Sequence, residues 1–437
     1  MFYLRACASE FIGTFMLVFT LGCNTMSGQV VWGGISTGCV LMALTYALAP
    51  ISGAHFNPAV TFSLGVLRRL EGGWFTVALY CAAQLAAGVA ASLCCSALFL
   101  GWVELSPAPG HGWASACACE ALYTCMLCFV VLNVAASEAN ADRQFYGVAI
   151  GLAVIAGTYG AGAISGACLN PALAIAIDLG GLRCDWCIPY TLAELAGAAA
   201  ATCLFAALRP EELEGAVAED EDLPEPGIKA KFLSELVGTY FLVLTVGLNV
   251  LTDSPAAALS IAASLACMIF ALGDLSEAHF NPAVTMAVYA IQKIDVRTGL
   301  IYGIAQFSGA AVAGLTYVAI CGNDFALGAA AGWSWTGVAA AETAFTFLLC
   351  FVMLSVTMSS KHRLSELYGL AIALCVVAGG FAAGGVSGGS LNPAVSFGVA
   401  VGDRGASAGQ ALLYAGFEFL SSVFAASAFM VTQGEFC

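Results

Sequence analysis

Twelve long apolar stretches, nearly free of charged residues, run along this chain. They lie near residues 7–27, 35–51, 74–100, 114–136, 146–163, 188–208, 232–251, 256–275, 299–320, 336–357, 367–385 and 408–431. At 1.5 Å per helical residue, each is long enough to cross about 30 Å of hydrocarbon. Across the chain, 60% of residues are hydrophobic and only 9% are charged, unlike a soluble globular domain. The sequence therefore predicts an all-α membrane protein with two sets of six transmembrane helices.

One strongly acidic segment, residues 209–231, separates the two sets. Its carboxylates, spaced by prolines and glycines, are Glu211, Glu212, Glu214, Glu219, Asp220, Glu221, Asp222 and Glu225. This composition predicts a solvated linker, with a regulatory docking segment as the alternative. The expected domains are thus 1–208 and 232–437. Because the linker supplies much of the net charge of −15, that charge does not indicate a nucleic-acid partner.

The basic residues predict the orientation of the chain in the bilayer. If the first span starts inside, eleven basic residues fall on the inner side and two, Arg183 and Arg404, on the outer side. The eleven are Arg5, Arg68, Arg69, Arg143, Arg209, Lys229, Lys231, Lys293, Arg297, Lys361 and Arg363. Short loops rich in Lys and Arg stay in the cytoplasm. The bias predicts a multi-pass protein with both termini and the linker cytoplasmic.

A fourfold internal repeat underlies the spans. A glutamate early in a span is followed by Asn-Pro-Ala after 47, 50, 46 and 50 residues, in the pairs Glu10/Asn57, Glu120/Asn170, Glu235/Asn281 and Glu342/Asn392. Each repeat holds three spans, an odd number, so successive repeats cross the bilayer in opposite directions. Inverted repeats place a solute path at their interface, near the middle of the membrane.

Each Asn-Pro-Ala motif predicts the start of a short helix. The motifs are Asn57-Pro58-Ala59, Asn170-Pro171-Ala172, Asn281-Pro282-Ala283 and Asn392-Pro393-Ala394. Proline at the first helical position loses no hydrogen bond, and the preceding asparagine is a natural cap. The short apolar run that follows each motif covers only about half of the hydrocarbon. These segments are therefore expected to enter the bilayer without crossing it.

Two such half-helices in inverted repeats are expected to meet at their N-termini. Each N-terminus presents about half a positive charge, which repels cations. The two asparagine side chains then offer hydrogen bonds to a neutral solute that has lost its hydration. One motif alone arises in many helix starts, but four in register with the repeat indicate a channel.

The sequence resembles the major intrinsic protein family, the aquaporins and glycerol facilitators, over nearly all of the chain outside the linker. Residues 9–24 (SEFIGTFMLVFTLGCN) are similar to the family's first helix, and 51–62 (ISGAHFNPAVTF) to its first pore loop. Residues 234–249 and 276–286 repeat both segments. The resemblance implies two aquaporin-like units, each with six transmembrane helices and two re-entrant half-helices. It also implies passive passage of water or small neutral solutes.

Family members usually form tetramers, so the resemblance implies a homodimer of this fused chain with four pores. It also implies that Glu10, Glu120, Glu235 and Glu342 brace the pore loops through buried hydrogen bonds. His55 and His279 would lie at the inner mouths as packing and hydrogen-bonding groups. Glu277 replaces the loop glycine seen as Gly53, and we expect a solvated carboxylate there, with a titrating cytoplasmic gate as the alternative.

The outer filter departs from the family pattern. Family members usually carry an arginine three residues after the second pore asparagine, where this chain has Leu173 and Val395. The family spacing assigns the filter of unit one to Thr37, Thr158, Ala167 and Leu173, and that of unit two to Ile261, Gly380, Gly389 and Val395. Different filters predict different pores, both wider than in strict water channels and open to glycerol, urea, ammonia, hydrogen peroxide or gases. An apolar filter that dewets and conducts little is the alternative.

Several other features have a less specific interpretation. Glu194 and Glu418 lie within the sixth span of each unit. Cys184 and Cys187 have C-x-x-C spacing without a second pair, which argues against zinc and leaves a loop disulfide as an alternative. No metal, cofactor or catalytic constellation is expected, so an enzyme is the least favoured class. A coupled secondary transporter and a non-conducting structural membrane protein are the rival functions.

Overall fold

A computed structural model describes residues 2–213, 225–360 and 363–434. It divides into two compact units, Met1–Leu223 and Pro224–Cys437. Unit 1 contains α1 (Phe2–Met26), α2 (Gly33–Ser52), α3 (Pro58–Val66), α4 (Trp74–Phe99), α5 (Trp113–Val131), α6 (Tyr146–Ser165), α7 (Pro171–Gly180) and α8 (Cys187–Leu208). Unit 2 contains α9 (Ile228–Leu251), α10 (Ala257–Ser276), α11 (Pro282–Ala290), α12 (Val296–Cys321), α13 (Trp335–Met353), α14 (Tyr368–Ser387), α15 (Pro393–Gly402) and α16 (Ala408–Gln433).

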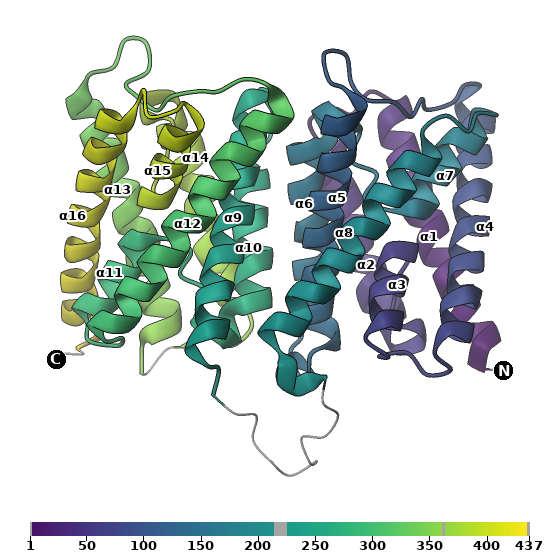
Figure 1. The fold of residues 1–437 in the computed structure, drawn as a ribbon, viewed down its shortest axis with the longest axis horizontal. Helices are drawn as coiled ribbons and strands as arrows, with labels where there is room; N and C mark the ends of the chain where they lie inside the picture. Colours follow the sequence, from purple (N-terminus) through teal and green to yellow (C-terminus); the bar gives the residue numbers. More distant parts are fainter. Residues whose placement is uncertain (1, 214–224, 361–362, 435–437) are drawn as a thin grey trace. The chain divides into compact units, whose positions relative to one another are not determined.

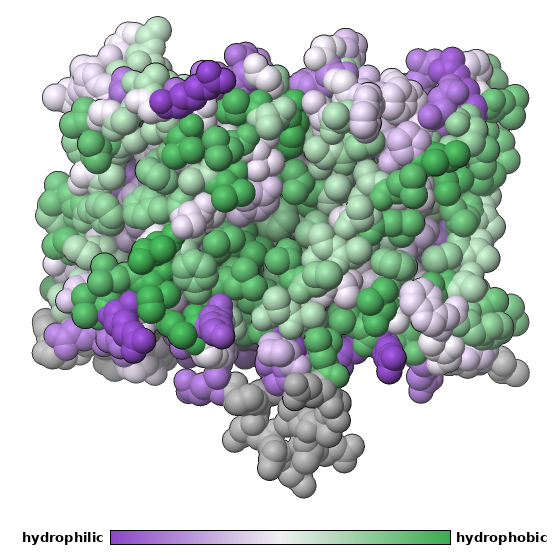
Figure 2. All heavy atoms as spheres, viewed as in Figure 1, coloured by the Kyte–Doolittle hydropathy of each residue, from purple (hydrophilic) through white to green (hydrophobic). Residues whose placement is uncertain are grey.

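Within the described residues, twelve helices are long and apolar enough to cross a membrane. Their bounds differ from the expected spans by only a few residues, and no strand occurs among the described residues. The all-α fold class is therefore confirmed. Figure 2 shows hydrophobic residues across the middle of each unit's visible face, with hydrophilic residues gathered toward the two ends.

Four short helices, α3, α7, α11 and α15, contain only 9 or 10 residues each. At 1.5 Å per residue they extend about 14 Å, roughly half of the hydrocarbon. In unit 1, α3 lies in the lower half of the bundle and α7 in the upper half (Figure 1). In unit 2, α11 and α15 are arranged in the same way. Each unit thus holds two half-helices that occupy opposite halves of its bundle, as inverted repeats require.

The fourth long helix of each unit ends in a π-helical turn. In unit 1 this turn, Leu132–Ala136, follows α5, and in unit 2 the turn Leu354–Met358 follows α13. Asn133 lies in the π-helical turn of unit 1, and its side chain donates to the Phe129 carbonyl at 2.8 Å. Single π-helical turns often occur at functional positions of helices.

The start of the expected linker packs on unit 1 and needs a correction. Arg209 is 2% exposed, and its Nε donates to Asn133 Oδ1 at 2.9 Å. Glu212 accepts a hydrogen bond from Ser137 Oγ at 2.6 Å and pairs with Arg69 at 2.9 Å. Because these charged groups find partners on unit 1, residues 209–212 are not part of a solvated tether.

The rest of the linker has two parts. Helix α9 begins at Ile228, so Lys229 and Lys231 belong to that helix. Five of the expected linker carboxylates lie outside the described residues, and so does the basic residue Lys361. The five are Glu214, Glu219, Asp220, Glu221 and Asp222.

Candidate functional site

The paired pore motifs of unit 1 hold each other through their asparagine side chains. Asn57 Nδ2 donates to the Leu169 carbonyl oxygen at 2.7 Å. Asn170 Nδ2 donates in return to the Phe56 carbonyl at 2.9 Å. Each carbonyl that accepts one of these hydrogen bonds belongs to the residue just before the opposite asparagine. This reciprocal contact fixes the N-termini of α3 and α7 tip to tip.

Unit 2 repeats the arrangement. Asn281 Nδ2 donates to the Leu391 carbonyl, and Asn392 Nδ2 donates to the Phe280 carbonyl, both at 2.9 Å. In all four motifs the asparagine Oδ1 caps its own half-helix by accepting from the amide two residues later, and proline is the first helical residue. Each amide side chain therefore caps one helix and holds the other.

The pore loops contain strained backbone conformations. The residues one before each asparagine have φ between 48° and 53°, and those three before have φ between 52° and 65°. The first group is Phe56, Leu169, Phe280 and Leu391, and the second is Ala54, Ala167, Ala278 and Gly389. A non-glycine residue in this region costs about 1–2 kcal/mol. The strain turns the carbonyls of the first group toward the opposite asparagine.

A buried glutamate compensates for this strain in each loop. In unit 1, Glu10 accepts hydrogen bonds from the amides of His55 and Phe56 at 3.0 and 2.7 Å, from Ser52 Oγ at 2.6 Å and from Gln84 Nε2 at 2.8 Å. Because the carboxylate meets four donors, it offsets the cost of its own burial. The structure thus places Glu10 behind the loop rather than in the pore.

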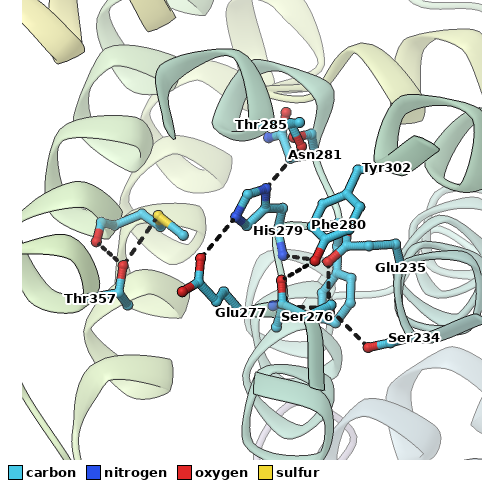
Figure 3. A network of polar contacts seen from close by, with 12 residues as sticks. Ser234, Glu235, Ser276, Glu277, His279, Phe280, Asn281, Thr285, Tyr302 and Thr357 are labelled. Atoms are coloured by element: carbon cyan, nitrogen blue, oxygen red, sulfur yellow. Dashed lines mark hydrogen bonds and ion pairs between the residues drawn. The ribbon is translucent and has the colours of Figure 1, made fainter. Parts of the chain in front are cut away.

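The other three glutamates occupy equivalent positions. Glu235 holds the loop before α11, as Figure 3 shows, by accepting from the amides of His279 and Phe280 at 2.9 and 2.7 Å. Glu120 accepts from Leu169 N at 2.7 Å, and Glu342 accepts from Leu391 N at 2.8 Å. All four are 0% exposed.

Glu194 and Glu418 belong to this machinery, although the sequence alone gave them no role. Glu194 Oε1 accepts from the amide of Asn170, and Glu418 Oε1 accepts from the amide of Asn392, each at 2.8 Å. In the first repeat of each unit, the position on the third span that corresponds to Glu194 or Glu418 is a glutamine, such as Gln84. The spacing of 74 residues from Glu10 to Gln84, which also separates Glu120 from Glu194, could have revealed this correspondence.

The residues assigned to the filter of unit 1 share one cavity of about 40 Å³. Thr37, Thr158, Ala167 and Leu173 all line it, and so do Asn57, Asn170 and His55. Each threonine hydroxyl donates to a carbonyl one helical turn earlier on its own helix. The remaining wall is mostly aliphatic, with Leu17, Leu41 and Val154 among its residues.

Unit 2 has a larger cavity, of about 210 Å³. Ile261, Gly380, Gly389 and Val395 line it together with Asn281, Asn392 and His279. Gly384 also lines this cavity, and a methyl group at that position would meet open space. Phe325 and Leu327, from the loop between α12 and α13, contribute to the wall as well. Sequence spacing did not indicate them because a long loop has no periodicity.

The two histidines lie at equivalent positions beside the pore motifs. The Nδ1 atoms of His55 and His279 lie 3.1 Å from the hydroxyls of Thr61 and Thr285. Both rings also make edge contacts with a tyrosine, at centroid distances of 5.2 Å. Among the described residues, no group of His, Cys, Asp and Glu is arranged to hold a metal ion.

Glu277 takes the place of a glycine in a left-handed backbone position. Its φ is +65°, against +87° for Gly53 in unit 1. Figure 3 shows its carboxylate directed toward His279, 3.9 Å from Nε2, an ion-pair distance too long for a hydrogen bond. Burial raises the pKa of Glu277, but the nearby His279 imidazole has the opposite effect. With the charges of Arg363 and Lys231 added, the pKa lies below its ordinary value.

Comparison with known proteins gives consistent matches. A family model described as Major intrinsic protein matches residues 1–156, 113–257 and 247–407. "Probable aquaporin NIP4-2" of Arabidopsis thaliana is 34% identical over 192 residues, which are 41% of this chain and 66% of that protein. "Aquaporin NIP1-4" of Oryza sativa subsp. japonica is 35% identical over 215 residues, 47% of this chain and 78% of that protein.

Among solved structures, the aquaglyceroporin from Plasmodium falciparum aligns with 46% of this chain and 95% of its own, at 21% identity and a TM-score of 0.42. The sequence relatives each align with less than half of this chain, while the family model matches three times along it. Such matches are consistent with a tandem fusion of two units. With twelve apolar helices and family matches over residues 1–407, the chain is an integral multi-pass membrane protein that belongs to the major intrinsic protein family.

Proposed function

We propose that the chain is a passive channel for water and small neutral solutes, with one path through each unit. The observation that carries this proposal is that, in each unit, each pore asparagine donates a hydrogen bond to the opposite pore loop and lies on the wall of a cavity. A path that ends at two helix N-termini disfavours cations. Passage is downhill, because no carboxylate among the described residues lines either cavity.

The asparagines suit a weak, sequential interaction with a neutral solute. Each Nδ2 has two hydrogens, and the contact with the opposite loop uses only one. The second hydrogen can be donated to a solute oxygen, which replaces part of the lost hydration without strong binding. The aliphatic walls offer no further hydrogen bond, so the solute leaves again easily.

The two pores differ in the solutes that they admit. The arginine usual in the family's outer filter is replaced by Leu173 and Val395, so both filters lack its charge and bulk. Unit 2 combines this change with glycines at 380, 384 and 389 and a cavity of about 210 Å³. We therefore assign glycerol, urea and similar solutes to unit 2. The cavity of about 40 Å³ favours water, ammonia or hydrogen peroxide in unit 1.

The surrounding features extend this proposal. The basic residues favour cytoplasmic termini and a cytoplasmic linker. Residues 1–208 and 232–437 would each form one channel unit. The exposed sides of a fused pair of units favour a homodimer that supplies four pores.

The rival functions have less support. A transporter coupled through carboxylates would need them on the solute path, but Glu10, Glu120, Glu235 and Glu342 are all held behind the loops by amide donors. A non-conducting structural protein would have no need for paired asparagines on a cavity wall. Catalysis is the least supported function, because known family members are channels.

Osmotic stopped-flow measurements on proteoliposomes test the proposal. Gly384→Trp should fill the cavity of unit 2, and Thr158→Trp the cavity of unit 1. We expect vesicles that contain the wild-type protein to change volume faster than empty vesicles in osmotic water gradients and in glycerol gradients. Gly384→Trp should abolish glycerol flux and retain water flux, while the double variant should match empty vesicles. Wild-type traces equal to those of empty vesicles for every solute would refute the channel.

A further inference from the structure

Two cysteine thiols meet in the turn between α7 and α8 of unit 1. Cys184 is exposed, and Cys187 is the first residue of α8 with 4% exposure. Their Sγ atoms lie 3.3 Å apart. A disulfide needs about 2.05 Å between the sulfur atoms, so side-chain rotation and a small backbone adjustment could close the gap. The Cys184 thiol is thus accessible from solvent, and the Cys187 thiol is buried next to it.

We infer that Cys184 and Cys187 are a redox-active pair that a peroxide oxidises to a disulfide. The Cys184 thiolate attacks one oxygen of hydrogen peroxide, which gives a sulfenic acid and releases hydroxide. The Cys187 thiolate then attacks that sulfur and displaces the second oxygen as hydroxide. With the two thiol protons, the products are one disulfide and two waters. The thiols lose two electrons and the peroxide gains them.

The turn is connected to the end of the outer half-helix. Asp178, near the end of α7, is 2% exposed. Its Oδ2 accepts from the amides of Trp186 and Cys187 at 2.8 and 2.7 Å. The C-x-x-C turn therefore shares an anchor with α7, which carries Leu173 on the cavity wall.

The same turn is also connected to the start of the second pore loop. The Trp186 ring makes an edge contact with Tyr190 at 6.3 Å between centroids. Tyr190 Oη donates to the carbonyl of Ser165 at 2.7 Å. The hydroxyl of Ser165 in turn donates to Glu120 at 2.6 Å. The dithiol turn thus contacts one end of the segment that forms the outer half of this pore and is linked to the other end through Tyr190.

Unit 2 provides an internal comparison. Its corresponding tyrosine, Tyr414, also donates to the carbonyl of Ser387. With the offset of 224 residues that relates Tyr190 to Tyr414, the positions that match the two cysteines are Ala408 and Ala411. Cys23 and Cys95 also approach each other, but between the membrane helices α1 and α4 and with Cys95 buried. Among the described residues, the accessible pair is thus confined to unit 1.

Oxidation has a predictable direction of effect, which rests on the proposed channel function. A solute passing through a cavity of only about 40 Å³ depends on small movements of the wall. A disulfide in the turn restricts the outer end of α7, so water flux through unit 1 falls. Unit 2 is unaffected.

The test uses the full chain carrying Gly384→Trp, so that only unit 1 conducts, with and without Cys184→Ser. After peroxide treatment, mass spectrometry of the peptide that contains both cysteines should show a disulfide that dithiothreitol reverses. Water flux should fall by at least about twofold and recover on reduction. The Cys184→Ser protein should keep its flux under peroxide.

Each other outcome has a distinct meaning. If both thiols remain open to alkylation after peroxide, the redox pair is refuted. If the disulfide forms without a change in flux, the connection to the pore is refuted. If the untreated Gly384→Trp protein shows no water flux, the proposed path through unit 1 fails, and the mass measurement alone then decides the thiol pair.

Discussion

Buried glutamates accept hydrogen bonds from backbone amides in every pore loop of this chain, whereas Glu212 and Glu277 meet charged side chains near helix ends. The first group has its donors fixed by the loop backbone, so its role is to hold strained residues such as Phe56 and Phe280 in place. The second group has ion-pair partners on side chains, Arg69 for Glu212 and His279 for Glu277. The same residue type therefore responds differently to substitution and to pH.

Glu277 gives a pH-dependent prediction. Its pKa lies below the ordinary value of 4.5, because the effect of burial is outweighed by His279 and the neighbouring positive charges. A carboxylate with a lowered pKa stabilises the folded chain at higher pH and loses that contribution as pH falls through the folded-state pKa. We expect Glu277→Gln to unfold at a lower temperature than wild type at pH 7. The difference should vanish once the pH falls below the folded-state pKa of Glu277. Thermal unfolding in detergent, recorded as a function of pH, measures the difference between the two unfolding temperatures. A difference that stays constant with pH would contradict a stabilising role for the Glu277 carboxylate.

Glu212 gives a prediction on stability. Removing its carboxylate deletes two ion pairs, one with the buried guanidinium of Arg209 at 3.7 Å and one with Arg69 at 2.9 Å. Loss of one partner of a buried pair costs about 3–5 kcal/mol. We expect Glu212→Ala to lower the free energy of unfolding by about 3 kcal/mol in denaturant titrations.

Glu211→Ala is the matched control for this change. Glu211 is partly exposed and precedes Glu212 in the same turn, so its replacement should change the free energy by less than about 0.5 kcal/mol. Equal effects of the two variants would show that residues 209–212 do not depend on the Glu212 contacts.

At the scale of elements, close approach of helices through glycine holds each bundle together. A methyl group on Gly197 of α8 would lie 2.2 Å from the carbonyl oxygen of Ala121 in α5, and one on Gly309 of α12 would lie 2.4 Å from the carbonyl of Leu236 in α9. Membrane helices lack a hydrophobic driving force between them, so small residues that allow backbone contact supply the packing.

Alanine substitutions at two glycines should therefore have opposite effects. Gly197→Ala must push α8 away from α5, which costs about 1–3 kcal/mol. Gly416 of α16 has no heavy atom within 4 Å of an added methyl group, so Gly416→Ala should stabilise the chain by about 0.5–1 kcal/mol through its helix propensity. Thermal unfolding in the same detergent compares them. A lower unfolding temperature for both variants, or for neither, would refute the packing argument.

At the scale of the whole molecule, the fused chain should assemble as a pair. Two six-helix units in one chain present related faces, and closed two-fold assembly is the commonest way to bury such faces. We expect native mass spectrometry from mild detergent to show a particle of twice the chain mass of 44.6 kDa. A particle of a single chain at all concentrations would refute the dimer and leave the two pores of one chain as the functional unit.

Much of this architecture follows from the sequence, because its signals are local. Long uncharged apolar stretches require a membrane and predict the twelve spans within a few residues. Asparagine followed by proline predicts where a half-helix starts, since capping and proline geometry depend on adjacent residues only. The fourfold spacing then predicts inverted halves.

Other features depend on contacts between residues far apart in the chain, so only the tertiary structure decided them. Asn57 holds a carbonyl 112 residues away, and Arg69 binds Glu212 143 residues away. Neither spacing nor composition indicates such pairs. The different cavity volumes also result from many side chains packed together, including Phe325 from a loop without periodicity. Local chemistry therefore determined the elements, whereas three-dimensional packing determined the dimensions of the pores.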